Sequence, residues 1–316
     1  MKKKMKKIKL LFLILLLFLI VGCTGFPSLS FLGKQDQPEI GRGIRMYFLP
    51  GAPPTDRIII GEGSTFLVRV GIDNYGEDVR GELKIWDNLP NGIETQIGII
   101  DAPLKAARTI SDPNDPDKII NIIPEKHFFP ETAQEFGYKS EDIAPGTKLN
   151  IFAELTINNY HVVIPTNFCL KRETAEDVPC SNQEVITSGK LGKQATYAPV
   201  TVDRIEKIAT PLGEDDFFVD LKIVLKNVGG GEIFSNDREK DVMEVPTVRI
   251  STAGNAECAP KKVIFTNNQA TINCIIKQLK VGQSYTDHQM WIEYNFPYKM
   301  RIKAGPIQLT SFDRNN

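Results

Sequence analysis

Apolar residues alternate with polar ones over much of the chain, which predicts β-strands with one buried face. Residues 149–157 show the pattern clearly, since every second residue from Leu149 to Ile157 is apolar. In the first half of the chain this alternation predicts strands at 43–49, 66–73, 83–86, 149–157 and 160–164. Helical periodicity is nearly absent. We therefore expect an all-β fold.

The second half of the chain predicts a fuller set of strands. They are expected at 200–208, 217–225, 245–251, 263–265, 270–276, 285–294 and 298–309. Gly229, Gly230 and Gly231 interrupt the series, and neither a Lys-Ser/Thr pair nor a helix start follows them, which favours a turn over a phosphate-binding loop. Seven short strands separated by turn signals are typical of an immunoglobulin-like sandwich.

Residues 89–145 interrupt the strand pattern of the first half. This span is rich in Pro, Asp and Asn, and we interpret it as a long, elaborated loop. Within it, Glu131–Tyr138 predicts one short helix.

The two halves of the chain look like diverged copies of one module. Residues 66–87 and 219–234 share a scheme in which an alternating strand ends in Asn, one further residue and Gly, and a second strand follows. Farther along each half, Gly146 and Gly282 each open what we interpret as a long hairpin with Asn near its turn. The join is expected in residues 181–198, which are polar, contain Gly and hold few large apolar side chains.

The amino terminus combines a basic cluster with an apolar run. Six lysines precede Leu10–Val21, an unbroken apolar run of 12 residues. A helix needs about 20 residues to cross the hydrocarbon core of a bilayer. The run therefore has the length of the apolar region of a signal peptide, and the lysines would stay on the cytoplasmic side.

These lysines also hide the charge of the remaining chain. The formal net charge is −1, but removing the six lysines from the 38 basic residues leaves 32 against 39 acidic residues. A mildly acidic body argues against nucleic acid as a partner.

The end of the apolar run, Ile20-Val21-Gly22-Cys23, resembles the lipobox of prokaryotic lipoproteins. This resemblance implies cleavage before Cys23 and attachment of lipid to its thiol. The chain would then be anchored in the cell membrane on its extracytoplasmic side. Residues 24–39 would form a tether. The alternative is an ordinary signal peptide or short amino-terminal anchor in which Cys23 has no role.

Residues 217–233, FFVDLKIVLKNVGGGEI, resemble the start of CARDB-type immunoglobulin-like modules of bacterial and archaeal surface proteins. Such modules are mostly spacers, adhesion units or assembly units, and the resemblance carries over no catalytic residue. It implies two tandem immunoglobulin-like β-sandwich domains. The expected segments are a signal peptide (1–22), the lipidated Cys and tether (23–39), a first sandwich (40–183) with its loop insertion (89–145), a linker (184–198) and a second sandwich (199–312).

Four cysteines remain once Cys23 is set aside. An even number in an exported chain predicts two disulfides. The spacing favours local pairs, Cys169 with Cys180 and Cys258 with Cys274. A zinc site is the alternative, but it would call for short C-x₂₋₄-C pairs, which are absent.

The second pair flanks a predicted hairpin. Residues 263–265 and 270–272 would be its strands, and Asn267 and Asn268 its turn, because Asn tolerates left-handed dihedral angles. Such a hairpin would bring the two sulfur atoms opposite each other.

Two acidic clusters are candidate cation sites. Asp112, Asn114, Asp115 and Asp117 place four oxygen-bearing side chains within six residues, and calcium prefers such ligands. Intervening prolines also suit an ordinary turn, and the spacing is not that of an EF-hand. The run 214–216, Glu-Asp-Asp, fits a solvated loop better than a cation site.

No catalytic pattern emerges around the three histidines, His127, His161 and His288. The chain has no G-x-S-x-G, H-E-x-x-H or S-x-x-K motif. We therefore expect neither an enzyme nor a bound cofactor.

Several aromatic residues could form a platform for sugars. They are Trp86, Trp291, Tyr294, Phe296 and Tyr298. Aromatic residues in strands of a sandwich more often belong to the core, which is the competing interpretation.

The leading hypothesis is a membrane-anchored surface lipoprotein that works as a binding, adhesion or structural module with a protein or cell-envelope partner. The alternative is a substrate-capture or accessory lipoprotein of a transporter or secretion complex, which would need a concave pocket with converging polar groups. An exported hydrolase is disfavoured because no nucleophile and base are paired in the sequence.

Overall fold

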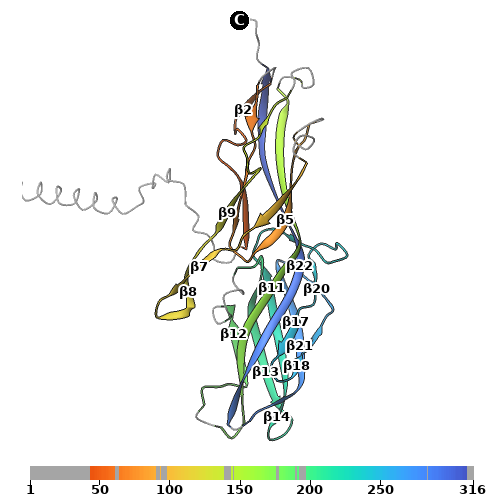
Figure 1. Cartoon of the computed structure of the whole chain (residues 1–316). Coiled ribbons are helices and arrows are strands. Elements are labelled where there is room, and N and C mark those ends of the chain that lie inside the picture. The colour runs from red at the N-terminus through yellow and green to blue at the C-terminus, as the bar shows by residue number, and fades with distance from the viewer. Residues whose placement is uncertain are drawn as a thin grey trace, which may run out of the picture. The chain divides into compact units, whose positions relative to one another are not determined.

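The computed structural model describes residues 43–60, 64–89, 93, 98–138, 144, 146–175, 178–188, 191, 197–282 and 284–311 (Figure 1). Of residues 112, 115–120 and 311 only the backbone is described. The predicted signal peptide, Cys23 and the tether lie outside this range. Residues 40–316 fall in one compact unit. No helix among the described residues is long and apolar enough to span a membrane.

The described chain is almost entirely β-structure, which confirms the all-β expectation. Nearly all strand pairs are antiparallel, the exception being β2 with β22. The strands are β1 (Ile44–Phe48), β2 (Arg57–Ile60), β3 (Phe66–Leu67), β4 (Val70–Asn74), β5 (Val79–Asp87), β6 (Ile99–Leu104), β7 (Arg108–Asp112), β8 (Asp115–Ile123), β9 (Glu125–Phe129), β10 (Glu135–Phe136), β11 (Lys148–Lys171), β12 (Gln183–Thr187), β13 (Val200–Pro211), β14 (Asp216–Asn227), β15 (Glu232–Ile233), β16 (Val242–Glu244), β17 (Thr247–Ile250), β18 (Gly254–Asn255), β19 (Glu257–Ala259), β20 (Lys262–Ile264), β21 (Gln269–Lys280) and β22 (Tyr285–Ser311).

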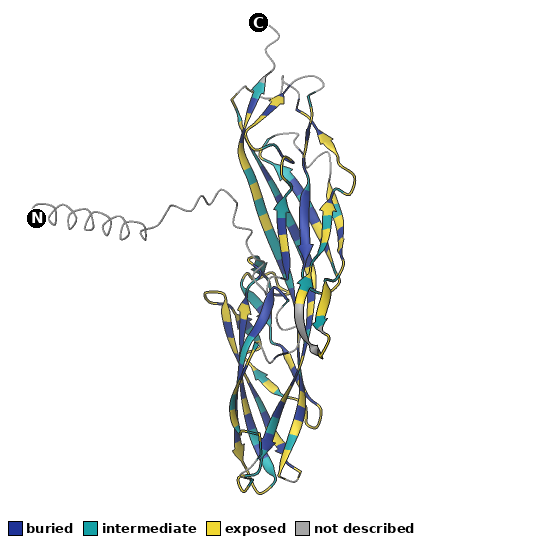
Figure 2. Ribbon diagram, turned by 90° about the vertical axis from the view of Figure 1, so that its left-hand side faces the viewer, coloured by how far each residue is buried: buried dark blue, intermediate teal, exposed yellow. Residues whose placement is uncertain are grey.

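The alternating sequence pattern becomes alternating burial along the strands (Figure 2). On β11, every second residue from Leu149 to Ile157 is fully buried. Burying a large aliphatic side chain contributes about 1.5–3 kcal/mol, so the four large side chains of this series stabilise the fold substantially. One continuous cluster of buried apolar residues extends from Ile44 to Leu309.

Two long strands, β11 and β22, organise the fold. They pair from Lys148↔Gln308 to Lys171↔Tyr285. In Figure 1 the two ribbons run side by side. They belong to an eight-stranded sheet with the order β18-β17-β22-β11-β5-β6, to which β2 and β15 add by pairing with β22.

Neither long strand is a hairpin, which corrects the expectation for the segments after Gly146 and Gly282. Between the pairs Ile157↔Tyr298 and Tyr160↔Phe296, β11 has two residues opposite one residue of β22. This is a β-bulge made by the predicted turn residues, 158 and 159. The single opposing residue is Pro297, which has no N–H to donate to the ladder.

Two further sheets pack against this frame. The larger has five strands in the order β12-β13-β14-β21-β19, and the smaller has three in the order β1-β4-β9. The remaining described pairs are β3 with β10, β7 with β8 and β16 with β20.

Residues 89–145 are not the irregular loop that we expected. The described part contains five strands, β6 to β10, and β6 extends the eight-stranded sheet. The predicted helix at 131–138 is also wrong, because Glu135–Phe136 forms β10. Burial here follows a period of two, since Phe136 and Tyr138 are both buried and their rings pack against Phe66.

Part of the predicted linker at 184–198 is a strand, and the sheets join segments on both sides of it. Residues 184–187 of that region belong to the edge strand β12, which pairs with β13, so this part of the linker prediction is wrong. A polar edge strand is easily mistaken for a linker because only Ile186 of β12 is buried. The carboxy-terminal part of β22 joins the sheet of β5 and β11, which lie in the first predicted domain. The number of domains stays a prediction.

Candidate functional site

Both predicted disulfides are present, Cys169–Cys180 and Cys258–Cys274. The first links the end of β11 to the segment before β12. The second joins directly opposed residues of β19 and β21, whose Cα atoms are 4.0 Å apart. The lipidation site proposed at Cys23 lies outside the described residues.

The hairpin that we predicted around the second disulfide is partly wrong. Its turn is confirmed, because Asn267 and Asn268 have φ of 52° and 62° beside the bridge Thr266↔Gln269. The strand opposite Cys274 is β19, however, whereas residues 262–264 pair with β16. Local spacing therefore predicted the disulfide but not the pairing of the strands.

The structure places the candidate calcium residues at the tip of the β7–β8 hairpin. Asp112 ends β7, Asn114 lies in the turn, and Asp115 and Asp117 belong to β8. Of these side chains only that of Asn114 is described, so the calcium site stays a prediction. Among the described residues, no group of three or more His, Cys, Asp or Glu side chains could hold a metal ion.

The second acidic cluster lies at the β13–β14 connection and is occupied by internal contacts. Asp215 pairs with Arg172, and Asp216 accepts a hydrogen bond of 3.1 Å from Gln278. The three glycines at 229–231 form a turn, as expected, with Gly230 at φ 72°.

The histidines lie apart and serve different contacts. His127 Nε2 accepts from the backbone N–H of Lys105, and exposed His161 lies 3.0 Å from Glu293. His288 is buried, and its Nδ1 lies 3.0 Å from the hydroxyl of Thr252. Its Nε2 has no hydrogen-bond partner among the described residues, so this pair lacks the third group that orients a catalytic base.

Most of the aromatic residues considered for a sugar platform belong to the core. Tyr294, Phe296 and Tyr298 are at most 3% exposed, which corrects that interpretation for them. Trp86 is partly exposed and stacks on Phe152 with ring centroids 5.4 Å apart.

A pocket of about 600 Å³ opens at the bulge of β11. Residues 76–80, at the turn between β4 and β5, form one wall, and residues 158–163 of β11 form another. Tyr197 and Ala198, just before β13, complete the described lining. This volume lies within the range of small-molecule sites, and the wall mixes apolar valines with several polar side chains. The pocket could not be predicted from the sequence because its shape depends on the bulge in β11.

Asn74, the last residue of β4, holds the turn that forms the first wall. Its side-chain amide donates to the carbonyls of Glu77 and Lys105, both at 2.8 Å. Its carbonyl oxygen accepts from the N–H of Gly76 at 3.0 Å. Asn74 is fully buried, so these bonds satisfy the amide and fix the turn.

The same arrangement recurs in the second half of the chain, which supports the predicted repeat. Asn227 ends β14, accepts from Gly229 N–H at 3.3 Å and donates to the carbonyl of Gly231 at 2.9 Å. A tyrosine packs against each turn, Tyr160 beside Gly76 and Tyr298 beside Gly229. A Cβ on either glycine would lie within 2.5 Å of the neighbouring tyrosine hydroxyl.

The two tyrosines differ in their hydrogen bonds. Tyr298 accepts from Gly231 N–H at 2.8 Å. The hydroxyl of Tyr160 is buried and has no hydrogen-bond partner among the described residues. Burial and the nearby charge of Glu77 raise the pKa of Tyr160, so this hydroxyl stays protonated and can both donate and accept.

The charged groups of the pocket are held by neighbours. Arg80 donates from Nε to Asp101 at 2.7 Å, and this hydrogen bond lowers the pKa of Asp101. Asp78 accepts from the N–H of Ala106 at 2.6 Å, and His161 contacts Glu293. The amides of residues 158 and 159 are exposed and make no hydrogen bond with a described residue.

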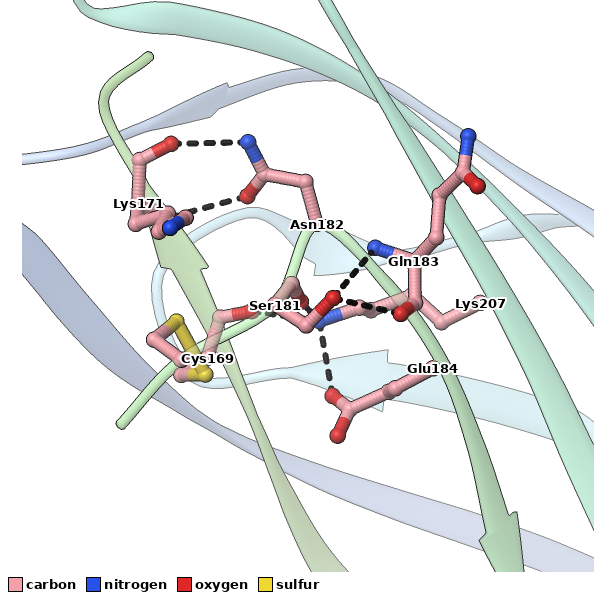
Figure 3. A network of polar contacts seen from close by, with 8 residues as sticks. Cys169, Lys171, Ser181, Asn182, Gln183, Glu184 and Lys207 are labelled. Atoms are coloured by element: carbon pink, nitrogen blue, oxygen red, sulfur yellow. Dashed lines mark hydrogen bonds and ion pairs between the residues drawn. A yellow bond between two sulfur atoms is a disulfide. The ribbon is translucent and has the colours of Figure 1, made fainter. Parts of the chain in front are cut away.

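A buried lysine forms a second polar cluster that sequence analysis missed (Figure 3). Lys207 is 1% exposed, and its Nζ donates to the carbonyls of Cys169 and Ser181 and contacts Glu184 Oε1 at 2.7 Å. Burial lowers the pKa of Lys207, and Glu184 opposes that effect. The cluster fastens β13 to both sides of the first disulfide.

Comparison of the sequence with models of known protein families and with curated proteins finds no match. The resemblances to lipoproteins and to CARDB-type modules therefore stay expectations, and the function must be argued from the residues of this chain.

Proposed function

We propose that this chain is an exported lipoprotein, anchored to the extracytoplasmic side of a cell membrane by lipid on Cys23, which acts as a non-catalytic binding module. The observation that carries this proposal is the pair of disulfides in the body. Disulfides persist in oxidising compartments, and the lysine cluster, apolar run and lipobox-like Cys23 supply an export signal and an anchor.

Within this proposal, the pocket favours substrate capture over a purely structural role. A spacer has no need for a concave site, whereas a capture lipoprotein needs one with polar groups that converge on a ligand. Two tandem immunoglobulin-like modules would then serve as the frame that presents the site.

Mass spectrometry of the full-length chain, expressed in bacteria and extracted from membranes, tests the anchor. We expect residues 1–22 to be absent and Cys23 to be the acylated first residue. The variant Cys23→Ser is the matched control, and it should retain the leader and take up no lipid. An intact Met1 or a free Cys23 thiol in the wild-type protein would overturn the proposal.

A separate experiment tests capture against adhesion. Chemical crosslinking in intact membranes should recover integral membrane subunits of a transporter or secretion complex if the chain is a capture protein. Recovery of cell-wall polymer or surface proteins alone would instead favour adhesion.

A further inference from the structure

The outward face of the eight-stranded sheet is both cationic and aromatic over the part of β11 that precedes the bulge. Strands β5, β11 and β22 present side chains to solvent in register there, because the alternate residues, such as Ile85 and Ala153, are fully buried. One row across the three strands is Trp86, Phe152 and Lys303, and the next row is Lys84, Glu154 and Arg301.

Neighbouring strands extend this surface. Arg57 and Ile59 of β2 are exposed beside β22, and Lys148 is exposed at the start of β11. Ile99 of β6 is 67% exposed and lies opposite Lys84. We define the basic face as five cations (Arg57, Lys84, Lys148, Arg301 and Lys303), one carboxylate (Glu154) and four apolar side chains (Ile59, Trp86, Ile99 and Phe152).

The basic face is opposite in sign to the body that carries it. The chain after the leader has 32 basic against 39 acidic residues, whereas cations outnumber carboxylates on this face. The side chain of Glu154 is 14% exposed and contacts Arg301 at 2.6 Å and Lys299 at 3.3 Å. The face ends at the row of Lys299, because Glu82 and Glu232 lie in that row.

The cations flank aromatic rings that remain partly exposed. Arg301 and Lys84 lie 5.4 and 5.7 Å from the ring centroid of Trp86, and this ring stacks on Phe152. Lys303 lies 5.8 Å from the ring of Phe152. Tryptophan is enriched at the headgroup level of bilayers, and lysine and arginine are attracted to anionic headgroups. The composition of the basic face therefore matches that of a surface in contact with anionic lipid.

The proposed anchor would keep this face near a membrane. The chain from Cys23 to residue 43, where the described body begins, spans at most about 70 Å when fully extended. An anionic bilayer repels an acidic body but attracts its basic face, and each cation near such a surface strengthens binding about fivefold. Charge therefore selects which side of the body turns toward the lipid.

We propose that the basic face docks on the surface of a bilayer that contains anionic phospholipid, so that the body lies against the membrane by this side of its sheet. This inference rests on the proposed function, because the lipid on Cys23 holds the body within reach of the bilayer. A soluble polyanion is the competing partner. The exposed side chains of Ile59 and Ile99 favour lipid, because a hydrated polymer offers them no apolar layer.

The two tryptophans of the chain provide matched reporters. Each is partly exposed and has an arginine near its ring, which for Trp291 is Arg249 at 4.9 Å. Trp291 lies 12 residues from Lys303 along β22, which is about 40 Å. The variant Trp291→Phe leaves only Trp86 to fluoresce, and Trp86→Phe leaves only Trp291.

Fluorescence quenching in vesicles tests the proposal with the full-length chain purified from membranes. The vesicles contain phosphatidylcholine alone or in equal parts with phosphatidylglycerol, and in both some phosphatidylcholine carries bromine near the headgroup. We expect Trp86 to be quenched at least about twofold more than Trp291 in the anionic vesicles and equally in the neutral ones. The excess should disappear in 1 M salt, where the Debye length is about 3 Å. Equal quenching of both tryptophans in anionic vesicles overturns the proposal.

Charge variants of the Trp291→Phe chain locate the contact. Replacing Lys148 and Lys303 by Gln removes two exposed cations of the basic face and should lower the quenching of Trp86 at least about twofold in anionic vesicles. Replacing Lys226 and Lys261 by Gln makes the same change in net charge at exposed positions elsewhere and should have no effect. Equal quenching in both double variants overturns the assignment to this face.

Two further readings separate the alternatives. If polyphosphate added in detergent changes the fluorescence of Trp86, and anionic vesicles give no excess quenching, the face binds a polymer and the proposal is overturned. Mass spectrometry of the same preparation reports on the anchor. An acylated Cys23 without excess quenching overturns only the docking, and a free Cys23 thiol with excess quenching overturns only the anchor.

Discussion

Replacing Lys207 by Met tests whether the buried lysine stabilises the body. Met retains the length and apolar stem of the side chain and removes the charge that Nζ carries. The carbonyls of Cys169 and Ser181 would lose their donor, and Glu184 would lose its counter-ion. Hydrogen bonds to a charged group contribute about 1.5–3 kcal/mol each, while release of Lys207 from burial returns several kcal/mol of desolvation cost.

The carboxylate of Glu184 is partly exposed and can regain water, whereas the two carbonyls have no other described donor at this position. We therefore expect Lys207→Met to lower the free energy of unfolding by about 2–4 kcal/mol, in the range found when one partner of a buried pair is removed. In a chain of this size that corresponds to a fall in Tm of about 4–16 °C.

Thermal unfolding of the full-length chain, followed by circular dichroism in detergent, measures the effect. Lys222→Met is the control, because Lys222 lies on the neighbouring strand β14 and forms an exposed pair with Glu206 at 3.1 Å. Its Tm should change by no more than about 4 °C, since exposed pairs contribute about 0–1 kcal/mol and each kcal/mol corresponds to about 2–4 °C. A Lys207→Met protein as stable as wild type would refute the reasoning and show that desolvation of the ammonium offsets its contacts.

Three further predictions concern the disulfide, pH and the turn. The double variant Cys258→Ala, Cys274→Ala should lower the free energy of unfolding by about 3 kcal/mol, because the disulfide closes a loop of sequence separation 16. Urea unfolding measures this change, and an unchanged midpoint would contradict the prediction. Burial lowers the pKa of His288 below its ordinary 6.5, so the imidazole takes up a proton at higher pH in the unfolded chain than in the folded chain. Stability should therefore fall as pH drops below about 6.5, and His288→Gln should flatten this part of the curve of Tm against pH. Gly76→Ala places a Cβ 2.2 Å from the hydroxyl oxygen of Tyr160 and should lower Tm. Adding Tyr160→Phe removes that oxygen and should recover part of the lost Tm. Equal Tm values for the single and double variants would count against a clash at that atom.

The strands could be predicted from the sequence because burial imposes a period of two. The alternation predicted at 43–49 and at 217–225 appears as β1 and β14, and the turn at Asn267-Asn268 was visible in residues that tolerate positive φ. Both disulfides were also predictable, since their partners are close in sequence. Each of these features depends on residues within a short stretch of chain.

Pairing between distant strands could not be predicted in the same way. Nothing local to residues 148–171 indicates that their partner is 285–308, and an Asn-Asn pair is compatible with a hairpin turn or with a bulge. Lys207 did leave a signal: Ile205 and Ala209 are buried on the same face of β13, while Ile208 is 49% exposed on the other. A lysine in phase with buried residues predicts a buried cation with partners.

The bulge connects the fold to the proposed site. Before it, the odd-numbered residues of β11 from Leu149 to Ile157 are buried, and after it the even-numbered residues from Tyr160 to Leu170 are buried. Without the extra residue the second half of β11 would turn its apolar face to solvent, so the bulge is required for both halves to bury their side chains. The bulge also places the exposed side chains of Asn158 and Asn159 among the residues that line the pocket, and it turns Tyr160 inward beside Gly76. The pocket is therefore a consequence of the bulge, which keeps the apolar side chains of both halves of β11 on the buried face of the sheet.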